Sequence, residues 1–320
     1  MKRPRGMAFT GGSAIDLEER LRRIEEALLE IRRQLDALIS GEADLMQALV
    51  SRGMELHRKD PQEEILFPPD ASPDQRDLFY QHLKRYSFRL FLRDVIAKGR
   101  GFALDDLLRY CSREVAEKYL SLLLDLGIAK EEGEAFVLSN PQIRSFGPTL
   151  EWFIAEMFRR ELASPAYYGV KLHTAPPGGD YDVISLWGGN LIYVEVKSSP
   201  PRGVEREEIR SFLLRLGALL PDCAFLFNDT HLRMKDKIIP FLEEEISHLS
   251  APVTFTRLTG ELFHLEHRLY VINSKKRILE NFLLCLRDFL LHTVLRTPSF
   301  LPMGGKDLKT SQPPSGSSRS

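Results

Sequence analysis

Apolar residues near the start of the chain recur at alternating steps of four and three. The seam consists of Leu17, Leu21, Ile24, Leu28, Ile31, Leu35 and Leu38. Two apolar positions in every seven form a narrow stripe along a helix, and this pattern predicts a coiled coil. We therefore expect a self-associating helix over residues 14–57, although Ser40-Gly41 interrupts the seam before Leu45 and Leu49 could resume it. The alternative is one amphipathic helix packed on the body of the protein.

Proline and helix-capping residues divide the next part of the chain. Residues 58–71 contain three prolines and predict a linker. The sequence Ser72-Pro73-Asp74-Gln75 then combines a capping box with proline at the first helical position. This signal, followed by apolar residues at helical spacing, predicts a helix that runs to about Lys98 and ends at Gly99-Arg100-Gly101.

Two more helices and a hairpin are predicted after this helix. Helical spacing indicates a short helix at 104–110 and a longer one at 112–127, and residues 128–138 read as strand, turn and strand. Three helices followed by a hairpin resemble a winged-helix domain, here over residues 72–142. Three glutamates at positions 131–134 make the tip of the hairpin acidic, and carboxylates repel phosphate. Binding to nucleic acid and a packing or protein-contact role are therefore equally open for this domain.

The remaining residues, 143–296, alternate between helical and strand patterns. In order, they predict a helix from Gly147 to Leu162, a strand at 167–174, a hairpin at 179–199, a helix at 204–219, a buried strand at 223–228, a helix at 235–249, strands at 253–258 and 268–272, and a closing helix at 274–295. Helices that alternate with strands in this way predict an α/β fold around one sheet.

The hairpin at 179–199 carries the residues of chemical interest. Gly188-Gly189 suits a two-residue turn, which pairs Trp187 with Asn190. Counting outward from this pair places Asp182 opposite Glu195. Side chains of a strand alternate between its faces, so Lys197 shares the face of Glu195. Two carboxylates and an ammonium group are therefore expected within a few residues of one another on one side of the hairpin.

Such a cluster is unfavourable unless another charge compensates it. Carboxylates directly across a ladder repel each other, and a hard divalent cation is the usual partner of clustered oxygen ligands. The spacing therefore suits a metal site beside a lysine, as hydrolysis of a phosphodiester requires. The alternative is a surface hairpin in which Glu195 and Lys197 form an ordinary ion pair, because an Asp followed at a distance by Glu-x-Lys also occurs by chance.

The same residues resemble a known family. Gly179-Asp180-Tyr181-Asp182-Val183-Ile184 precedes Val194-Glu195-Val196-Lys197-Ser198-Ser199, with thirteen residues from Asp182 to Glu195. This arrangement is similar to the motif of the PD-(D/E)xK nuclease superfamily, although the proline of that motif is absent. The resemblance implies a restriction-endonuclease-like fold at the C-terminus, with an αβββαβ core whose second and third strands carry the acidic residues and the lysine.

The resemblance also implies a role for each matching residue. Asp182 and Glu195 match metal ligands, the backbone carbonyl of Val196 matches a further ligand, and Lys197 matches the catalytic lysine. Many resolvase-like members carry an acidic residue on the first helix of the core, and Glu151 matches it. Alternatively, Glu151 only stabilises the positive end of that helix, an effect of about 0.3–1 kcal/mol. The metal implied is Mg²⁺ or Mn²⁺.

Composition and charge add limits to this interpretation. The 320 residues carry a formal net charge of −1, so any contact with nucleic acid needs a local basic patch. Cys111, Cys223 and Cys285 lie far apart in apolar surroundings and predict reduced core residues of a cytoplasmic protein, and the eight histidines show no metal-ligand spacing. No apolar run predicts a signal peptide or membrane span. Residues 1–13 and 297–320 have the composition of disordered segments.

Together these features predict a metal-dependent nuclease with its active site on the hairpin. Its substrate would be nucleic acid, with DNA favoured over RNA, and the coiled coil would make it a homo-oligomer. The competing prediction is a catalytically inactive nuclease fold that binds nucleic acid or acts as a scaffold or regulatory module. A third is a winged-helix regulator whose nuclease-like domain senses a ligand.

Overall fold

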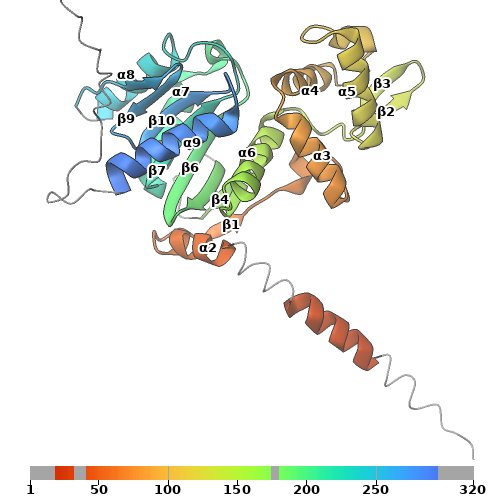
Figure 1. Ribbon diagram of the computed structural model, residues 1–320, viewed down its shortest axis with the longest axis horizontal. Coiled ribbons are helices and arrows are strands. Elements are labelled where there is room, and N and C mark those ends of the chain that lie inside the picture. The colour runs from red at the N-terminus through yellow and green to blue at the C-terminus, as the bar shows by residue number, and fades with distance from the viewer. Residues whose placement is uncertain (1–18, 32–40, 100, 174–179, 250, 295–320) are drawn as a thin grey trace, which may run out of the picture.

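A large mixed sheet forms the centre of the protein. The computed structural model describes residues 19–31, 41–99, 101–173, 180–249 and 251–294. Within them, eight strands form one sheet in the order β1-β4-β5-β6-β7-β10-β9-β8. The strands are β1 (Leu56–Arg58), β4 (Ala166–Leu172), β5 (Tyr181–Trp187), β6 (Asn190–Lys197), β7 (Cys223–Asn228), β8 (Thr256–Thr259), β9 (Leu262–Leu265) and β10 (Leu269–Asn273). The fold is therefore mixed α/β, as expected (Figure 1).

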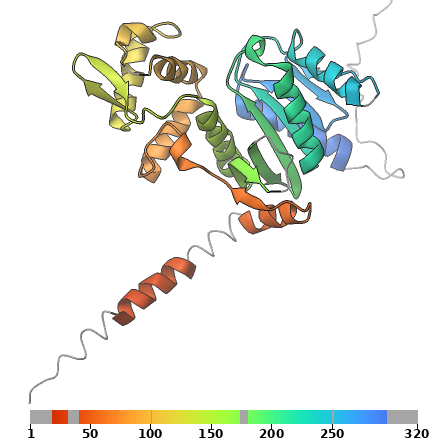
Figure 2. The same cartoon turned by 180° about the vertical axis from the view of Figure 1, so that it is seen from behind.

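Helices cover both faces of this sheet. They are α2 (Glu42–Val50), α6 (Gly147–Glu161), α7 (Arg206–Leu219), α8 (Ile238–Leu249) and α9 (Ile278–Phe289). Helices α6 and α9 share one apolar cluster with the sheet, and helices α2, α7 and α8 share a second cluster with its other face. Figure 1 shows α9 in front of the sheet, and the reverse view in Figure 2 shows the face covered by α7 and α8.

The central strands align the residues that the sequence singled out. Along the chain, α6, β4, β5, β6, α7 and β7 follow one another in the α-β-β-β-α-β order that the resemblance implies. Strands β4, β5 and β6 are antiparallel neighbours, whereas β7 runs parallel to both β6 and β10. The registers bring the last residues of the three parallel strands, Lys197, Asn228 and Asn273, to one edge. The carboxyl edge of parallel strands is where α/β sheets commonly bind ligands.

The segment before residue 72 differs from the expectation of a long coiled-coil helix and a linker. Leu45 and Leu49 of α2 are fully buried against the sheet instead of continuing the heptad seam. Strand β1 pairs with β4 at the edge of the sheet. Ile65, Leu66 and Phe67, within the expected linker, are at most 4% exposed and belong to the core. The prolines of this segment suggested a linker. The three apolar residues that they flank instead anchor the segment in the core.

The next region consists of helices followed by a hairpin. Its elements are α3 (Pro73–Leu83), α4 (Tyr86–Lys98), the short 3-10 helix η2 (Leu104–Leu107), α5 (Arg113–Asp125) and the strands β2 (Ala129–Glu132) and β3 (Ala135–Leu138). The Ser72 capping box and Pro73 at the first turn are present as predicted. The single helix predicted to Lys98 is wrong, because Arg85 is extended and separates α3 from α4.

This break allows the two helices to pack on different partners. Tyr80 of α3 packs on Phe153 of α6, with ring centroids 5.3 Å apart. Phe88 of α4 packs instead on Tyr119 of α5, with ring centroids 4.9 Å apart. A straight helix would carry its apolar stripe along one side and would not reach both partners.

Part of the predicted coiled coil lies in a helix over residues 19–31. Its seam residues Leu21, Ile24, Leu28 and Ile31 are each more than half exposed. Leu17, Leu35 and Leu38, the terminal segments 1–13 and 297–320, and the end of the loop that leads into the hairpin at 174–179 lie outside the described residues. Within the residues that are described, no helix has the length and apolar character needed to span a bilayer.

Candidate metal centre and active site

The hairpin of β5 and β6 has the register predicted from its glycines. Trp187 pairs with Asn190, and the ladder runs to the pair of Val183 and Val194. Asp182 is the next residue of β5 and meets β6 through its side chain. Its Oδ2 atom accepts a hydrogen bond of 2.6 Å from the backbone N–H of Val196. This hydrogen bond holds the carboxylate of Asp182 at the end of β6. Its donor, Val196, is the residue between Glu195 and Lys197.

A local irregularity of the sheet places Asp182. In β4, Tyr168 pairs with Val183 and Val170 pairs with Tyr181, so Gly169 lies across from Asp182. Tyr168 and Val183 belong to one apolar cluster, whereas Val170 and Tyr181 belong to the other. Regular alternation would keep Val183 and Tyr181 on one face. Gly169 has a positive φ of 54°, a backbone conformation that glycine adopts easily. The resulting kink in β4 changes which face the side chains point to on either side of Asp182.

Glu195 is buried among three donors. Its carboxylate is 1% exposed and receives hydrogen bonds of 2.7 and 2.6 Å from Arg215 of α7 and of 2.5 Å from the Tyr193 hydroxyl. The Nζ atom of Lys197 lies 2.9 Å from Glu195 Oε1. Burial alone would raise the pKa of Glu195, but the charges of Lys197 and Arg215 hold that pKa below its usual value. Glu195 is therefore ionised and already paired with two cations.

Lys197 bridges two carboxylates. Besides Glu195, its Nζ atom donates a hydrogen bond of 2.9 Å to Glu208 Oε1 at the start of α7. Burial would lower the pKa of Lys197, but the adjacent Glu195 and Glu208 raise it above its usual value. The ammonium group is therefore charged and fixed beside Asp182 and Glu195.

Glu151 and Asp182 are the two carboxyl groups of the site whose pKa values are raised. Burial, followed by the charge of Glu195, raises the pKa of Asp182 to about 8. Burial and then the charges of Asp182 and Glu195 raise the pKa of Glu151 well above its usual value. Glu151 is the fifth residue of α6 and so lies beyond its first turn, where the helix dipole is weak. Asp182 and Glu195 therefore both act on Glu151, and Glu195 acts on Asp182.

The donor set suits a hard divalent ion. Within the described residues, the Glu151 carboxylate has no hydrogen-bonding or ion-pair partner, and all the candidate ligands are oxygen atoms, which Mg²⁺ and Mn²⁺ prefer. Glu151 and Asp182 fit the metal better than Glu195 does, because Arg215 and Lys197 occupy both oxygens of Glu195. The carbonyl of Val196 remains a predicted ligand.

A second group of possible metal ligands lies elsewhere. In the described part of the chain, it is the only set of three acidic, histidine or cysteine residues whose ligand atoms all lie within 4.8 Å of one another. It consists of His264, His267 and Asp288. The spacing of the histidines along the chain did not indicate this group. Two of the ligands are only three residues apart, but the third is on a helix far along the chain, which sequence spacing does not reveal.

A buried ion-pair cluster joins the helical region to the edge of the sheet that carries Lys197. Asp229, directly after β7, is fully buried, and Arg89 of α4 donates to its two oxygens at 2.9 and 2.8 Å. Arg93 of α4 also pairs with Asp229. The backbone N–H of Asp229 donates to the carbonyl of Lys197 at 2.8 Å. Sequence reasoning missed this cluster; a charged residue directly after an apolar strand was the available signal.

A cleft lies beside this cluster. Its volume is about 570 Å³, and Tyr86, Arg93, Tyr110, Ser198, Ser199 and Arg202 are among the residues that line it. Ser198 and Ser199 directly follow Lys197, so the cleft adjoins the candidate site. Arg202 thus lies close to the site. Arg206 and Arg210, further along the chain, form ion pairs with Glu244 and Glu245 of α8.

Asp180, two residues before Asp182, has cationic partners of its own. Its Oδ2 atom lies 3.7 Å from Arg58 and 3.5 Å from Lys171, and its side chain is 42% exposed. Asp180 is therefore a partly solvated residue with its charge already paired.

Comparison with known proteins gives limited similarity. No protein-family model matches the chain, and no curated protein matches it. Among solved structures, protein VC1899 from Vibrio cholerae has a TM-score of 0.45 and 16% identity over 78% of this chain and 61% of that one. Can2 from Sulfobacillus thermosulfidooxidans, in complex with cyclic tetra-adenylate, has a TM-score of 0.43 and 14% identity over 75% of this chain and 60% of that one. The chain thus spans less than two thirds of the length of either protein.

Proposed function

We propose that this protein is a metal-dependent nuclease that hydrolyses phosphodiester bonds in nucleic acid, with DNA favoured over RNA. In this proposal, residues 143–296 form a PD-(D/E)xK nuclease domain. The observation that carries the proposal is a set of buried carboxylates beside the fixed ammonium group of Lys197: burial and then neighbouring carboxylates raise the pKa values of both Glu151 and Asp182. A divalent cation would compensate the charge of such buried carboxylates and remove their repulsion.

Each residue of the site has a role in this reaction. Glu151, Asp182 and the carbonyl of Val196 would hold Mg²⁺ or Mn²⁺, with Glu195 completing the ligand set. The bound ion would polarise the phosphoryl group and lower the pKa of water. Lys197 would orient the attacking water and stabilise negative charge on the phosphate, since its ammonium group is held in place by Glu195 and Glu208. Arg215 is a positioning residue that fixes Glu195.

The adjoining cleft supports nucleic acid as the substrate. Arg202 supplies positive charge, and Tyr86 and Tyr110 supply aromatic faces on which bases can stack. Arg93 also lines the cleft but is paired with Asp229. The winged-helix-like region contributes Tyr86, Arg93 and Tyr110 to the cleft, so we propose that it helps to hold the substrate.

A cleavage panel tests the proposal. Single-stranded, duplex and branched DNA and RNA would be incubated with the full-length protein and Mg²⁺ or Mn²⁺. At least one substrate should be cut, and Asp182→Asn or Lys197→Ala should each reduce the rate by at least about 10²-fold. Asp236→Asn and Lys235→Ala make the same chemical changes at exposed positions before α8 and should retain activity. Equal cleavage by the site variants and the wild type would exclude this active site.

One observation favours the alternative of an inactive nuclease fold that binds or scaffolds. Arg215 and Lys197 together already neutralise Glu195, as they would in a structural ion-pair network. Calorimetric titration with Mn²⁺ distinguishes the two proposals. Binding that is lost in Asp182→Asn supports a metal centre, whereas an absence of binding to the wild type supports the scaffold.

We also propose that the heptad seam makes the protein a homo-oligomer. The apolar side chains of Leu21, Ile24, Leu28 and Ile31 are between 52% and 60% exposed in the single chain. A second copy of the same helix would cover this stripe by knobs-into-holes packing.

A further inference from the structure

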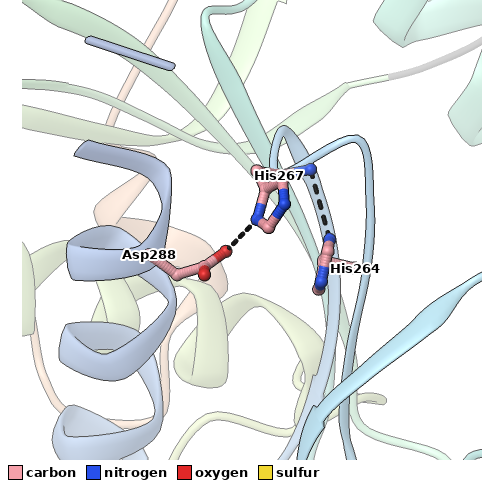
Figure 3. A group of neighbouring side chains, drawn as sticks. All are labelled: His264, His267 and Asp288. Atoms are coloured by element: carbon pink, nitrogen blue, oxygen red, sulfur yellow. Dashed lines mark hydrogen bonds and ion pairs between the residues drawn. The ribbon is translucent and has the colours of Figure 1, made fainter. Parts of the chain in front are cut away.

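A cluster of imidazole rings lies where the β9–β10 turn meets the end of α9. His264 is in β9, His267 is in the turn, and Asp288 is near the last turn of α9 (Figure 3). A π-helical turn over Leu290–Val294 continues from α9 and carries His292. The turn precedes β10, so the cluster lies at the opposite edge of the parallel strands from Lys197. It is therefore separate from the candidate nuclease site.

The three histidines surround one carboxylate. His267 Nδ1 lies 2.7 Å from Asp288 Oδ2, and His292 Nδ1 lies 3.2 Å from Asp288 Oδ1. The ring of His267 stacks between the other two, with centroids 4.1 Å from His264 and 4.0 Å from His292. Ligand atoms of His264, His267 and Asp288 all lie within 4.8 Å of one another. Tetrahedral ligands about 2.0 Å from a zinc ion are roughly 3.3 Å apart, so a shift of about 1.5 Å or less would bring these atoms together.

The backbone of the turn holds His267 in an unfavourable conformation. Arg268 N–H donates to the Leu265 carbonyl at 3.0 Å and closes a two-residue turn. Glu266 and His267, the two residues within it, have positive φ angles of 53° and 55°. Turns of this type favour asparagine and glycine, because other side chains are strained there. Strained residues persist where other contacts fix them, and the contacts of His267 with Asp288 and its neighbouring rings do so here.

Asp288 is held by its neighbours, and an ion bound here would replace the direct contact between His267 Nδ1 and Asp288 Oδ2. Its side chain is 8% exposed, and the Tyr270 hydroxyl lies 2.7 Å from its Oδ2 atom. The same hydroxyl lies 3.1 Å from the carbonyl of His267. Hydrogen bonds of this kind hold ligand groups in place around metals and increase affinity.

We propose that His264, His267 and Asp288 bind a transition-metal ion of the zinc type. Imidazole nitrogens with one carboxylate suit Zn²⁺ and its neighbours in the first transition row, in contrast to the all-oxygen donors at Asp182, which suit Mg²⁺. The ion would join the β9–β10 turn to the end of α9 and so fix the closing helix on the sheet.

Metal analysis of untagged full-length protein tests this proposal. After removal of metal with EDTA, addition of Zn²⁺ and desalting, the wild type should retain about one zinc per chain, bound by two imidazoles and one carboxylate. Cobalt substitution should produce the visible absorption of a tetrahedral site. His267→Asn removes one ligand but supplies a residue that tolerates positive φ, so this variant should fold and bind zinc at least about tenfold more weakly. Asp288→Asn should show the same loss.

Two control variants separate this site from other metal binding. The double variant His57→Ala/His173→Ala removes another pair of touching histidines, whose ring centroids are 4.5 Å apart, and should keep the zinc. Asp182→Asn should also keep it, because that residue belongs to the other site. A wild type that retains no zinc, or a folded His267→Asn variant that retains as much as the wild type, would overturn the proposal.

Discussion

The guanidinium group of Arg215 is, with the ammonium group of Lys197, one of the two cations that keep Glu195 charged in the interior. It contacts both carboxylate oxygens and also donates to the Tyr193 hydroxyl at 2.9 Å. Removal of one partner of a buried pair leaves an uncompensated charge, which costs about 3–5 kcal/mol. Arg215→Met should therefore lower the free energy of unfolding by about this amount in a denaturant titration. Arg206→Met, on the same helix but paired at the surface with Glu244, should change stability little.

The raised pKa of Asp182 makes stability depend on pH in the absence of metal. Its pKa rises from 3.8 to about 8 on folding, so between these values the folded protein keeps a proton that the unfolded chain loses. Stability should therefore fall as pH rises through this window, by at most about 1.4 kcal/mol per pH unit from this residue. Asp182→Asn removes the effect. In EDTA, the variant should gain stability relative to wild type from pH 4 to pH 8; parallel profiles would contradict the raised pKa.

At the scale of one strand, Gly169 sets the kink that positions Asp182. A Cβ atom there would lie 2.8 Å from the ring of Pro61, and its positive φ disfavours every side chain. Gly169→Ala should therefore destabilise the protein by about 2 kcal/mol or more, from the backbone conformation and the steric overlap together. Gly217→Ala in α7 is the matched control with the opposite sign. A Cβ atom there has no neighbour within 4 Å, and alanine favours the helix by about 0.5–1 kcal/mol.

Local signals predicted the elements whose determinants are close together in sequence. Gly188-Gly189 indicated the register of β5 and β6, and Ser72 indicated the start of α3. The break at Arg85 was not predictable, because it depends on where α5 and α6 lie. Strand β9 was missed, since four residues between two turns give too short a pattern.

Contacts between distant elements explain what the sequence did not reveal about the candidate site. Asp182 and Lys197 could be placed by counting along one hairpin, whereas Arg215 comes from α7 and its orientation depends on how that helix packs. The direct contact of Glu195 with two cations was likewise hidden. For the same reason, the sequence could not reveal that His267, in the turn before β10, pairs with Asp288 of α9.

For the whole molecule, the N-terminal boundary of the folded body can be tested by truncation. A chain of residues 41–320 keeps Leu45 and Leu49, which are fully buried, and should unfold at the same temperature as the full-length protein. Because it lacks the heptad seam, light scattering should show a smaller oligomer. A chain of residues 58–320 also loses α2 and most of β1, and each buried leucine contributes about 1.5–3 kcal/mol. It should melt well below the longer chain; an equal melting temperature would show that α2 is dispensable.

Strand β1 is made early in translation but hydrogen-bonds to β4, which leaves the ribosome much later. Until then, the apolar side of α2 has no sheet to cover it, and Leu45 and Leu49 are available to chaperones or to other nascent chains. Contacts that close so long a stretch of chain form slowly. Low temperature or additional chaperone during expression should therefore raise the yield of the full-length protein, and the first residues of the domain to be synthesised would be among the last to reach their final place.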